Sequence, residues 1–217
     1  MSNRDFLQKA ADYAAHNAAL PPLGRVDWLE AAVEQFTTKG VNAVRITQLA
    51  TQLGVSRGSF YWHFKNRADL LQSIVLFWGQ KNAQSVIAAV QEATEMGEGM
   101  FALYSCWLDV HRFDPQLDMA MRDWARNDPA IKKQVRQADL KCIEAISDFF
   151  KRMGVEKLEA ITRARTIYFC QIGYYALDLQ EPMPQRLQYL EDTFYILAGH
   201  RLSPALAQKF RAQFAKE

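Results

Sequence analysis

The 217-residue sequence predicts an all-α protein, with an N-terminal three-helix helix-turn-helix domain and a larger C-terminal helical domain. Apolar residues recur at helical spacing along most of the chain, and no segment gives a clear strand pattern. Glycine, proline and polar cap residues separate the helical stretches. Residues 46–67, ITQLATQLGVSRGSFYWHFKNR, stand apart because they form two short helical segments without any acidic residue.

Composition is that of an ordinary globular protein, with 49% hydrophobic and 23% charged residues. No apolar run reaches the roughly 18 residues that suggest a membrane span. The N-terminus lacks the apolar core and cleavage pattern of a signal peptide, so we expect a cytoplasmic protein. Cys106, Cys142 and Cys170 have neither metal-site nor disulfide spacing, which predicts reduced, buried thiols. A redox-sensing role for them stays open.

The first two segments of the chain are an extension and a strong helix. Residues 1–24 predict an N-terminal extension and linker, because weak helical spacing there is broken at Leu20-Pro21-Pro22. From Arg25 an apolar stripe between Trp28 and Phe36 predicts a helix, and Gly40 is its expected C-cap.

Three shorter helices follow, each introduced by a polar cap residue. Thr47 is the expected N-cap of the second helix, which ends at Gly54. Ser56 caps a third helix that runs roughly to His63, and Asn66 caps a fourth. Residues 25–80 are therefore predicted to form the helix-turn-helix domain.

Residues 81–217 predict the larger helical domain, expected to serve dimerisation and ligand binding. The Met96-Gly97-Glu98-Gly99 stretch is expected to be a loop. Further breaks leave helical candidates at 100–112, 115–126, 129–153, 156–180 and 184–200. A last helix starts at Pro204, with Ser203 as its cap.

Charge is concentrated in the predicted helix-turn-helix. Between Glu34 and Asp69 there are five basic residues and no acid, whereas the whole chain carries a net charge of +2. A basic cluster on one element is the electrostatic footprint of phosphate binding, and a solvated basic surface is the alternative.

The outward face of the third helix carries groups suited to nucleic acid. Arg57 can hydrogen-bond guanine O6 and N7, and Ser59 can reach a base edge or a phosphate. Gly58 costs roughly 1 kcal/mol of helix propensity relative to alanine, but it allows close approach of the helix to DNA. Thr47 and Ser56 sit at helix N-termini, which favour an anion.

Three consecutive residues, Tyr61, Trp62 and His63, end in polar groups suited to phosphate oxygens. The alternative is an aromatic patch that packs on the fourth helix. That alternative suits one of the three, but this short helix must also bury Phe60 and Phe64.

The segment TQLATQLGVSRGSFYWHFKNRADLL resembles the N-terminal DNA-binding domain of the TetR family of transcriptional regulators, over about residues 25–75. The resemblance implies a homodimer on double-stranded operator DNA, with the second helix of the motif in the major groove. It implies base-edge contacts from Arg57, Gly58, Ser59 and Tyr61. It implies phosphate contacts from Thr47, Ser56, Trp62, His63 and Arg67, with Lys65 close enough to help.

Helices near 156–180 and 184–200 are the expected dimer interface, because both have broad apolar faces. The resemblance implies that they pack against their mates as a four-helix bundle, and an intramolecular core is the alternative. Their stripes are Ile161, Tyr168, Ile172, Tyr175 and Leu179 on the first, and Leu187, Leu190, Phe194 and Leu197 on the second.

A pocket for an unidentified small molecule is expected in the same domain. Its candidate lining residues are aromatic or pliable, namely Tyr104, Trp107, His111, Met121, Trp124 and Tyr174. Core packing is the alternative for each of them. His111 lies near Asp109 and Asp114 but has no second histidine, so we expect no metal and no other cofactor.

These patterns indicate a DNA-binding transcriptional regulator, specifically a repressor released from its operator by a small molecule. The alternative is a ligand-independent helical protein that occupies or organises DNA. A closed cavity would favour the first function and a solid core the second. Because no nucleophile–base pair, metal cluster or phosphate loop is found, we do not expect an enzyme.

Overall fold

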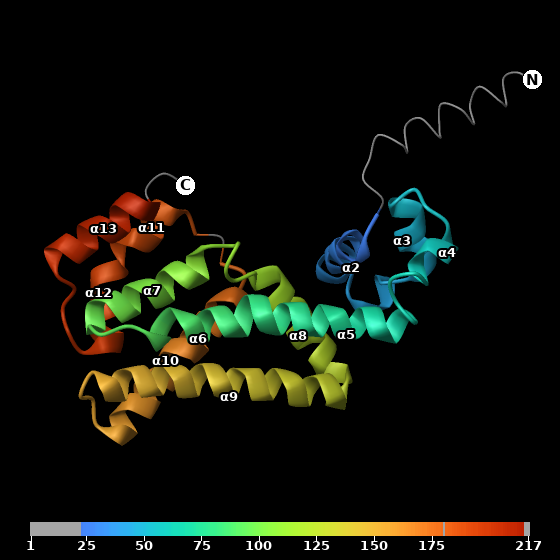
Figure 1. Ribbon diagram of the computed structural model, residues 1–217. Coiled ribbons are helices and arrows are strands. Elements are labelled where there is room, and N and C mark those ends of the chain that lie inside the picture. The colour runs from blue at the N-terminus through green and yellow to red at the C-terminus, as the bar shows by residue number, and fades with distance from the viewer. Residues whose placement is uncertain (1–22, 180, 215–217) are drawn as a thin grey trace, which may run out of the picture.

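The computed structural model describes residues 23–179 and 181–214, and every regular element in these ranges is helical, which confirms the all-α class (Figure 1). In chain order the elements are α2 (Arg25–Lys39), η1 (Val41–Ala43), α3 (Ile46–Gln52), α4 (Arg57–Phe60), α5 (Arg67–Trp78), η2 (Gly79–Ala83), α6 (Gln84–Gln91), α7 (Met96–Leu108), α8 (Pro115–Asn127), α9 (Pro129–Arg152), α10 (Lys157–Ala176), α11 (Met183–Gln188), α12 (Leu190–Ala198) and α13 (Pro204–Phe214). The predicted N-terminal extension falls almost wholly on residues 1–22, outside the described residues.

Helices α2, α3 and α4, with the start of α5, form a head at one end of the molecule (Figure 1). Its core holds fully buried apolar side chains from all four helices, Trp28, Phe36, Leu49, Phe60 and Leu70. The rings of Trp28 and Phe60 meet edge to face, with centroids 5.3 Å apart. One aromatic residue therefore anchors the short α4 to the longer α2.

The core of the head continues into α8 and the start of α9. Leu117 and Met121 from α8 and Ile131 from α9 are buried in the same apolar cluster. The ring of Trp124 meets Phe36 of α2 at a centroid distance of 5.8 Å. The head thus shares its hydrophobic interior with helices that lie beyond residue 80.

A continuous helical run from α5 through the π-helical η2 to α6 leads out of the head (Figure 1). The buried Asn82 side chain ties this run to the start of α8. Its Nδ2 donates to the Asp114 carbonyl at 2.8 Å, and its Oδ1 accepts from the Asp114 amide at 3.2 Å.

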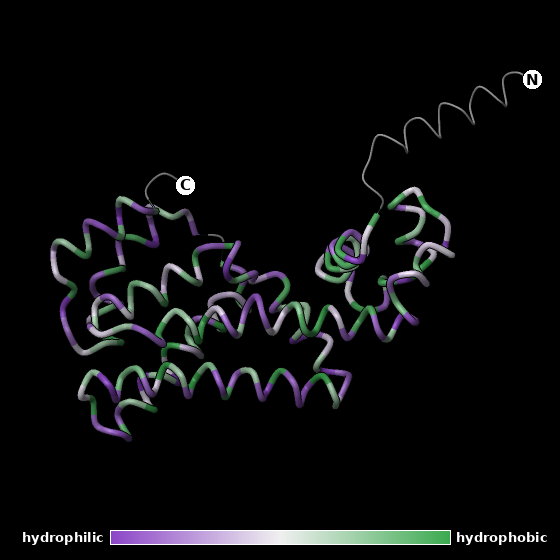
Figure 2. Tube along the Cα trace, in the orientation of Figure 1, coloured by the Kyte–Doolittle hydropathy of each residue, from purple (hydrophilic) through white to green (hydrophobic). Residues whose placement is uncertain are grey.

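The remaining helices enclose a second core between α6, α7, α9, α10 and α12. Met100, Leu103, Ile146, Phe149 and Phe150 are completely buried there. Figure 2 shows apolar and polar residues alternating along these helices, as amphipathic packing requires. A smaller cluster of Leu187, Leu190, Phe210 and Phe214 packs α11 and α13 near α7. None of the described helices is long and apolar enough to span a membrane.

Several predicted boundaries are wrong, and helix α7 ends at Leu108 instead of the predicted residue 112. Helix α3 begins at Ile46 with Arg45 as its N-cap, so Thr47 is the second helical residue and not the cap. Helix α4 ends at Phe60, before the predicted end near His63. The predicted helix at 184–200 is divided into α11 and α12 at Tyr189.

The predicted loop at Met96–Gly99 is also wrong, because these residues form the first turn of α7. Glycine serves close packing here. A Cβ on Gly99 would lie 2.2 Å from a ring carbon of Phe149, and one on Gly97 would lie 2.7 Å from Leu206. Helix α7 can approach its neighbours this closely only where it lacks side chains.

Candidate functional site

The turn between α3 and α4 depends on Ala50 and Gly54. Ala50 is buried, and its carbonyl accepts a 3.0 Å hydrogen bond from the Val55 amide. Gly54 has φ +69°, in the left-handed region that favours glycine. The two residues fix how the second helix of the motif leaves the first.

Helix α4 and the turn after it separate their aromatic residues into an inner and an outer set. Phe60 and Phe64 are buried and stacked, with ring centroids 5.4 Å apart. Tyr61 is 61% exposed and Trp62 is 87% exposed. The alternative in which this aromatic patch packs on the following helix is therefore wrong for Tyr61 and Trp62, and only His63 is partly buried.

The N-terminal part of α4 is open to an approaching molecule. Arg57 and Gly58 are exposed, and a Cβ on Gly58 would meet nothing closer than Ser56 Oγ, at 3.5 Å. Ser56 is the N-cap, as predicted, but its side chain makes no capping hydrogen bond. Ser59 is partly buried beside them. Intramolecular packing therefore does not account for glycine at position 58.

Basic residues surround this surface. Lys39, Arg45, Arg57 and Lys65 are all exposed, and so is Thr47 in the first turn of α3. Asp69 is the first acid after α4, and its carboxylate accepts the Lys65 amide at 3.0 Å as part of the N-terminal cap of α5. The exposed surface of α3 and α4 is therefore positively charged.

Arg67 lies in a different environment from the other basic residues. It is partly buried, and its Nε donates to the Val44 carbonyl at 2.6 Å while Nη2 donates to the Val41 carbonyl. Arg67 thus donates from α5 to two carbonyls at the η1 turn, and the Val41 carbonyl also accepts the Val44 amide at 3.3 Å. The structure thus engages the guanidinium in bracing the turn before α3, whereas the sequence prediction assigned it to a phosphate.

Arg25 is a residue that the sequence analysis did not single out. Its guanidinium donates to the His63 carbonyl and, at 2.8 Å, to Ser73 Oγ, and it lies 4.1 Å from the Phe64 ring centroid. Asp69 is 3.8 Å away. Arg25 therefore holds the end of the α4 segment against α5. Its partners are about 40 residues distant in sequence, so spacing gave no signal for this role.

The C-terminal domain contains a cavity of about 320 Å³ between α7, α10, α11, α12 and α13. Three predicted pocket residues, Tyr104, Trp107 and Tyr174, line it. The structure does not bring the other three there. His111 is exposed in the turn after α7.

Met121 and Trp124 pack in the core of the head, so the structure separates them from the cavity. The cavity walls that the sequence analysis missed come from α10, α11, α12 and α13, including Gln171, Arg186, Leu190 and Phe210. Nothing in the local sequence indicates that these late helices fold back onto α7.

The cysteines divide into two kinds. Cys106 and Cys142 are buried as predicted, and burial raises the pKa of their thiols to about 11 and about 12. Such thiols stay protonated and unreactive. Cys170 is exposed and lines the cavity, so the prediction that it is buried is wrong. Within residues 23–179 and 181–214, no group of three potential ligands is placed to hold a metal ion.

A buried polar network connects the head to the cavity wall. Trp78 of α5 donates to Asp118 at 2.8 Å, and Arg122 of α8 donates to Asp118 at 2.7 Å. Arg122 also makes two hydrogen bonds to Asp139 of α9, and Tyr168 of α10 donates to Asp139 at 2.8 Å. Burial raises the pKa of the Asp118 carboxyl, and the charge of Arg122 opposes that effect. The network thereby links four helices.

The first predicted dimer stripe lies largely within the chain, because Tyr168 is buried and Ile172 and Tyr175 pack against the core, whereas Ile161 and Leu179 are exposed. Along α10 the exposed residues include Leu158, Ile161 and Phe169, and on α12 Ile196 is 73% exposed. The second predicted stripe, Leu187, Leu190, Phe194 and Leu197, is buried within the chain. That stripe is therefore intramolecular core.

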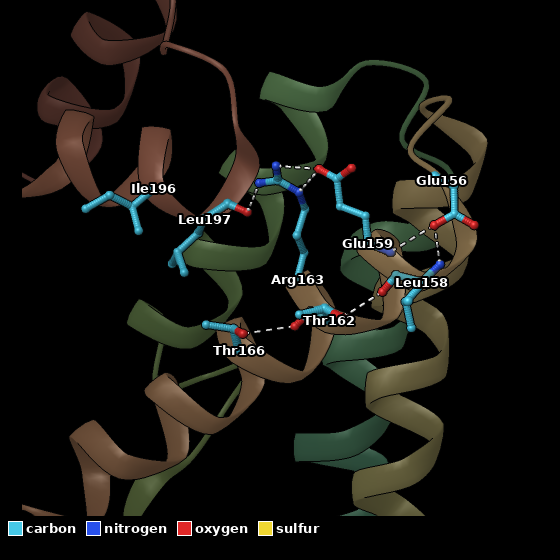
Figure 3. Close-up of a pocket in the computed structure, with 8 residues that line it drawn as sticks. All are labelled: Glu156, Leu158, Glu159, Thr162, Arg163, Thr166, Ile196 and Leu197. Carbon is cyan, nitrogen blue, oxygen red and sulfur yellow. Dashed lines mark hydrogen bonds and ion pairs between the residues drawn. The ribbon is translucent and has the colours of Figure 1, made fainter.

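A groove of about 540 Å³ runs along this surface between α10 and α12 (Figure 3). Arg163 crosses it, donating to the Leu197 carbonyl at 2.8 Å and pairing with Glu159 at 2.6 Å. Leu158, Thr162 and Thr166 of α10 and Ile196 of α12 line the same groove. We refer to the exposed stripe Leu158, Ile161, Phe169 and Ile196 as the α10–α12 face.

The fold and the α3–α4 surface define a helix-turn-helix protein. Residues 29–74 match the family model described as "Bacterial regulatory proteins, tetR family". The N-terminal domain of the chain therefore resembles that of the TetR family of bacterial regulatory proteins.

Curated relatives match the same segment. TtgR, an HTH-type transcriptional regulator of Pseudomonas putida, is 39% identical over 51 residues, or 24% of each chain. BepR, an HTH-type transcriptional repressor of Brucella suis, is 43% identical over 47 residues, or 22% of each chain. These matches span about a quarter or less of the relatives' length.

Solved structures extend the likeness of fold to most of the chain. A TetR-family regulator from Marinobacter aquaeolei has a TM-score of 0.62 at 17% identity, covering 88% of this chain and 97% of that one. PfmR, a TetR-family regulator from Thermus thermophilus, has a TM-score of 0.57 at 17% identity, covering 87% and 94%. The two-part helical fold is thus similar to the folds of these solved structures.

Proposed function

We propose that this protein is a cytoplasmic, homodimeric transcriptional repressor that leaves its operator when a small molecule binds. The observation that carries the proposal is the exposed, acid-free surface of α4, with Arg57, Gly58, Tyr61 and Trp62 directed outward among basic residues. Such a helix can enter the major groove while its neighbours contact phosphates.

The contacts divide by chemistry. Arg57 reads a guanine edge with two hydrogen bonds, Ser59 adds a base-edge contact, and Gly58 permits the approach. Tyr61 contributes a further base-edge contact. Phosphate contacts come from Thr47, Ser56, Trp62, His63 and Lys65. Arg67 and Arg25 support the interface without contacting DNA. Arg67 holds the turn before α3, and Arg25 holds the end of the α4 segment.

Homodimerisation through the α10–α12 face supplies the second recognition helix. Exposed apolar side chains on two neighbouring helices form a surface that a second copy would cover. A symmetric pair of heads reads two half-sites roughly 34–36 Å apart. Repression agrees with the function of BepR, a transcriptional repressor.

Release by a ligand is supported by the cavity and the polar network together. Ile167 and Gln171 of α10 line the cavity, and Tyr168 between them in sequence belongs to the network. A ligand that displaces α10 would alter the Asp139–Arg122 contact and thereby α8, which shares its core with the head. The two heads would then no longer match the half-site spacing. The cavity favours this function over that of a ligand-independent helical protein that occupies or organises DNA.

Selection of bound sites from random duplexes, followed by fluorescence anisotropy on the selected site, tests the proposal. Arg57→Ala should relax preference at one base pair by about 1–3 kcal/mol. Tyr61→Ala should weaken binding, and His63→Ala should weaken it similarly across sequences. Lys151→Ala, which removes an exposed charge at the far end of α9, is the control. If all three variants bind the selected site like the wild type, the interface assignment is wrong.

A further inference from the structure

The cavity in the C-terminal domain has an apolar, aromatic wall. Tyr104, Trp107 and Phe210 contribute rings from α7 and α13, and Tyr104 lies edge to face with both other rings. Its volume of about 320 Å³ lies near the lower end of the roughly 300–1,000 Å³ that small-molecule sites occupy. The occupant must therefore be small and lipophilic over most of its surface.

One positive charge stands at this apolar wall. Arg186 of α11 is partly buried, and its guanidinium carbon lies 4.6 Å from the centroid of Tyr174, another lining residue. Within the described residues Arg186 has no ion pair. In contrast, Arg163 pairs with Glu159 at 2.6 Å and Arg211 pairs with Glu191 at 2.5 Å. Arg186 is thus the lining cation that a ligand can neutralise.

A second polar group of the wall, the side-chain amide of Gln171, favours a ligand that carries a hydrogen-bond acceptor. Gln171 is 9% exposed, and its Nε2 has no hydrogen-bond partner among the described residues. Glu181 also lines the cavity, but its carboxylate accepts a hydrogen bond from Gln185 on the next turn of chain, at 3.4 Å. A lipophilic cation would instead pair with Glu181, so probes with an amine head group test that alternative.

We propose that this cavity binds a lipophilic carboxylate, with its hydrocarbon part against the aromatic wall and its carboxylate paired with Arg186. The guanidinium and carboxylate form a charge-assisted, bidentate pair, and the low polarity of the wall strengthens that pair. The inference rests on the proposed function for its biological meaning, because it names the chemical class of the releasing molecule.

The test uses the full-length protein without DNA and two series of probes that differ only in the head group. 4-Phenylbutyrate, 4-phenylbutanol and 4-phenylbutylamine form the aromatic series, and octanoate, octanol and octylamine form the aliphatic one. Titration calorimetry and tryptophan fluorescence measure binding. At least one carboxylate should bind about tenfold or more tightly than its alcohol and its amine, which corresponds to one charged hydrogen bond. The series that binds identifies the hydrocarbon class.

Arg186→Gln should abolish the preference for the carboxylate. Arg201→Gln is the matched control, because Arg201 also stacks on a tyrosine, 4.8 Å from the Tyr195 ring, but does not line the cavity. Arg186→Lys should keep part of the preference if charge is the main contribution. Circular dichroism verifies that each variant is folded.

Equal or tighter binding of an alcohol or amine would overturn the proposal. The absence of binding by all six probes, or an Arg186→Gln variant that keeps the preference, would also overturn it. The two experiments distinguish an incorrect ligand class from an incorrect regulatory function. If the DNA-contact variants lose operator binding but no carboxylate binds, only the ligand class is wrong. If carboxylates bind but no DNA site is selected, the cavity assignment stands and the regulator assignment falls.

Discussion

The guanidinium of Arg122 donates two hydrogen bonds, of 2.7 and 3.1 Å, to the carboxylate of Asp139 across the α8–α9 interface. The same guanidinium donates to Asp118 on its own helix at 2.7 Å. Arg122 therefore binds two carboxylates, one of them almost completely buried. Its position explains how α8 can transmit a displacement from α10 toward the head.

Tyr168→Phe tests this junction. Removing the hydroxyl deletes the 2.8 Å hydrogen bond to Asp139, and we expect a loss of about 1 kcal/mol in the free energy of unfolding. Tyr195→Phe is the control, since Tyr195 is 46% exposed and lies outside the network. Urea denaturation measures both variants. An equal effect of the two substitutions would contradict the role given to Tyr168.

Gly58→Ala should separate folding from DNA binding. A Cβ at position 58 would find its nearest contact at 3.5 Å, so alanine should raise stability by about 0.5–1 kcal/mol through helix propensity. The added methyl group should at the same time weaken operator binding. Gly54→Ala should destabilise instead, because φ there is +69°. Thermal melts and anisotropy provide the two readings. If Gly58→Ala binds DNA normally, close approach at this helix is not required.

Trp62→Ala should leave the fold intact. Its side chain is 87% exposed, and substitutions at such sites usually change stability by no more than about 0.5 kcal/mol. Binding should weaken to a similar degree on selected and random DNA, because a phosphate contact carries no sequence information. A loss confined to the selected site would show that Trp62 reads bases.

Arg67 and Lys65 should differ in the salt dependence of DNA binding. Lys65→Ala removes an exposed charge next to DNA, so the slope of log K against log salt should fall by about 1. Arg67→Ala removes the donors to the Val41 and Val44 carbonyls. We expect it to lower stability and affinity while the slope stays near that of the wild type. A slope reduced by about 1 would restore Arg67 as a phosphate contact.

Phe169→Glu should disrupt the homodimer. Phe169 is 50% exposed on the α10–α12 face, and burying a carboxylate there would be costly even beside Arg165, whose guanidinium lies 5.0 Å from the Phe169 ring centroid. Light scattering should show a monomer at micromolar concentration. Leu140→Glu is the matched control, since Leu140 is 53% exposed on α9. If the dimer persists with Phe169→Glu but is lost with Leu140→Glu, the interface lies on α9 and the α10–α12 assignment is wrong.

Sequence predicted the elements whose signals are local. Pro115 and Pro129 begin α8 and α9 at the first helical position, and Asn66 caps α5 through its side chain. The predicted loop at Met96–Gly99 is wrong because a glycine there permits close packing and does not break the helix. Gly99 leaves space for the ring of Phe149. A one-dimensional pattern cannot distinguish a glycine that bends a chain from one that admits a neighbour.

Residues of the candidate sites were predictable where chemistry and local position coincide, as on α4. They were not predictable where side chains meet from distant segments. Trp124 resembles a pocket residue by type, but the ring of Phe36 holds it in the head. Arg186 lines the cavity because α11 meets α7 and α10 there. The spacing of residues in the sequence does not predict this contact.

The core shared between the head and α8 has a consequence for protein engineering. A fragment of residues 25–80 would leave the surface covered by Leu117, Met121 and Ile131 open to water. Chimeric repressors that exchange only this fragment would have mismatched interiors at the graft. Successful exchanges should carry the facing side chains of α8 and α9 with the head, so the transplantable unit is discontinuous in sequence.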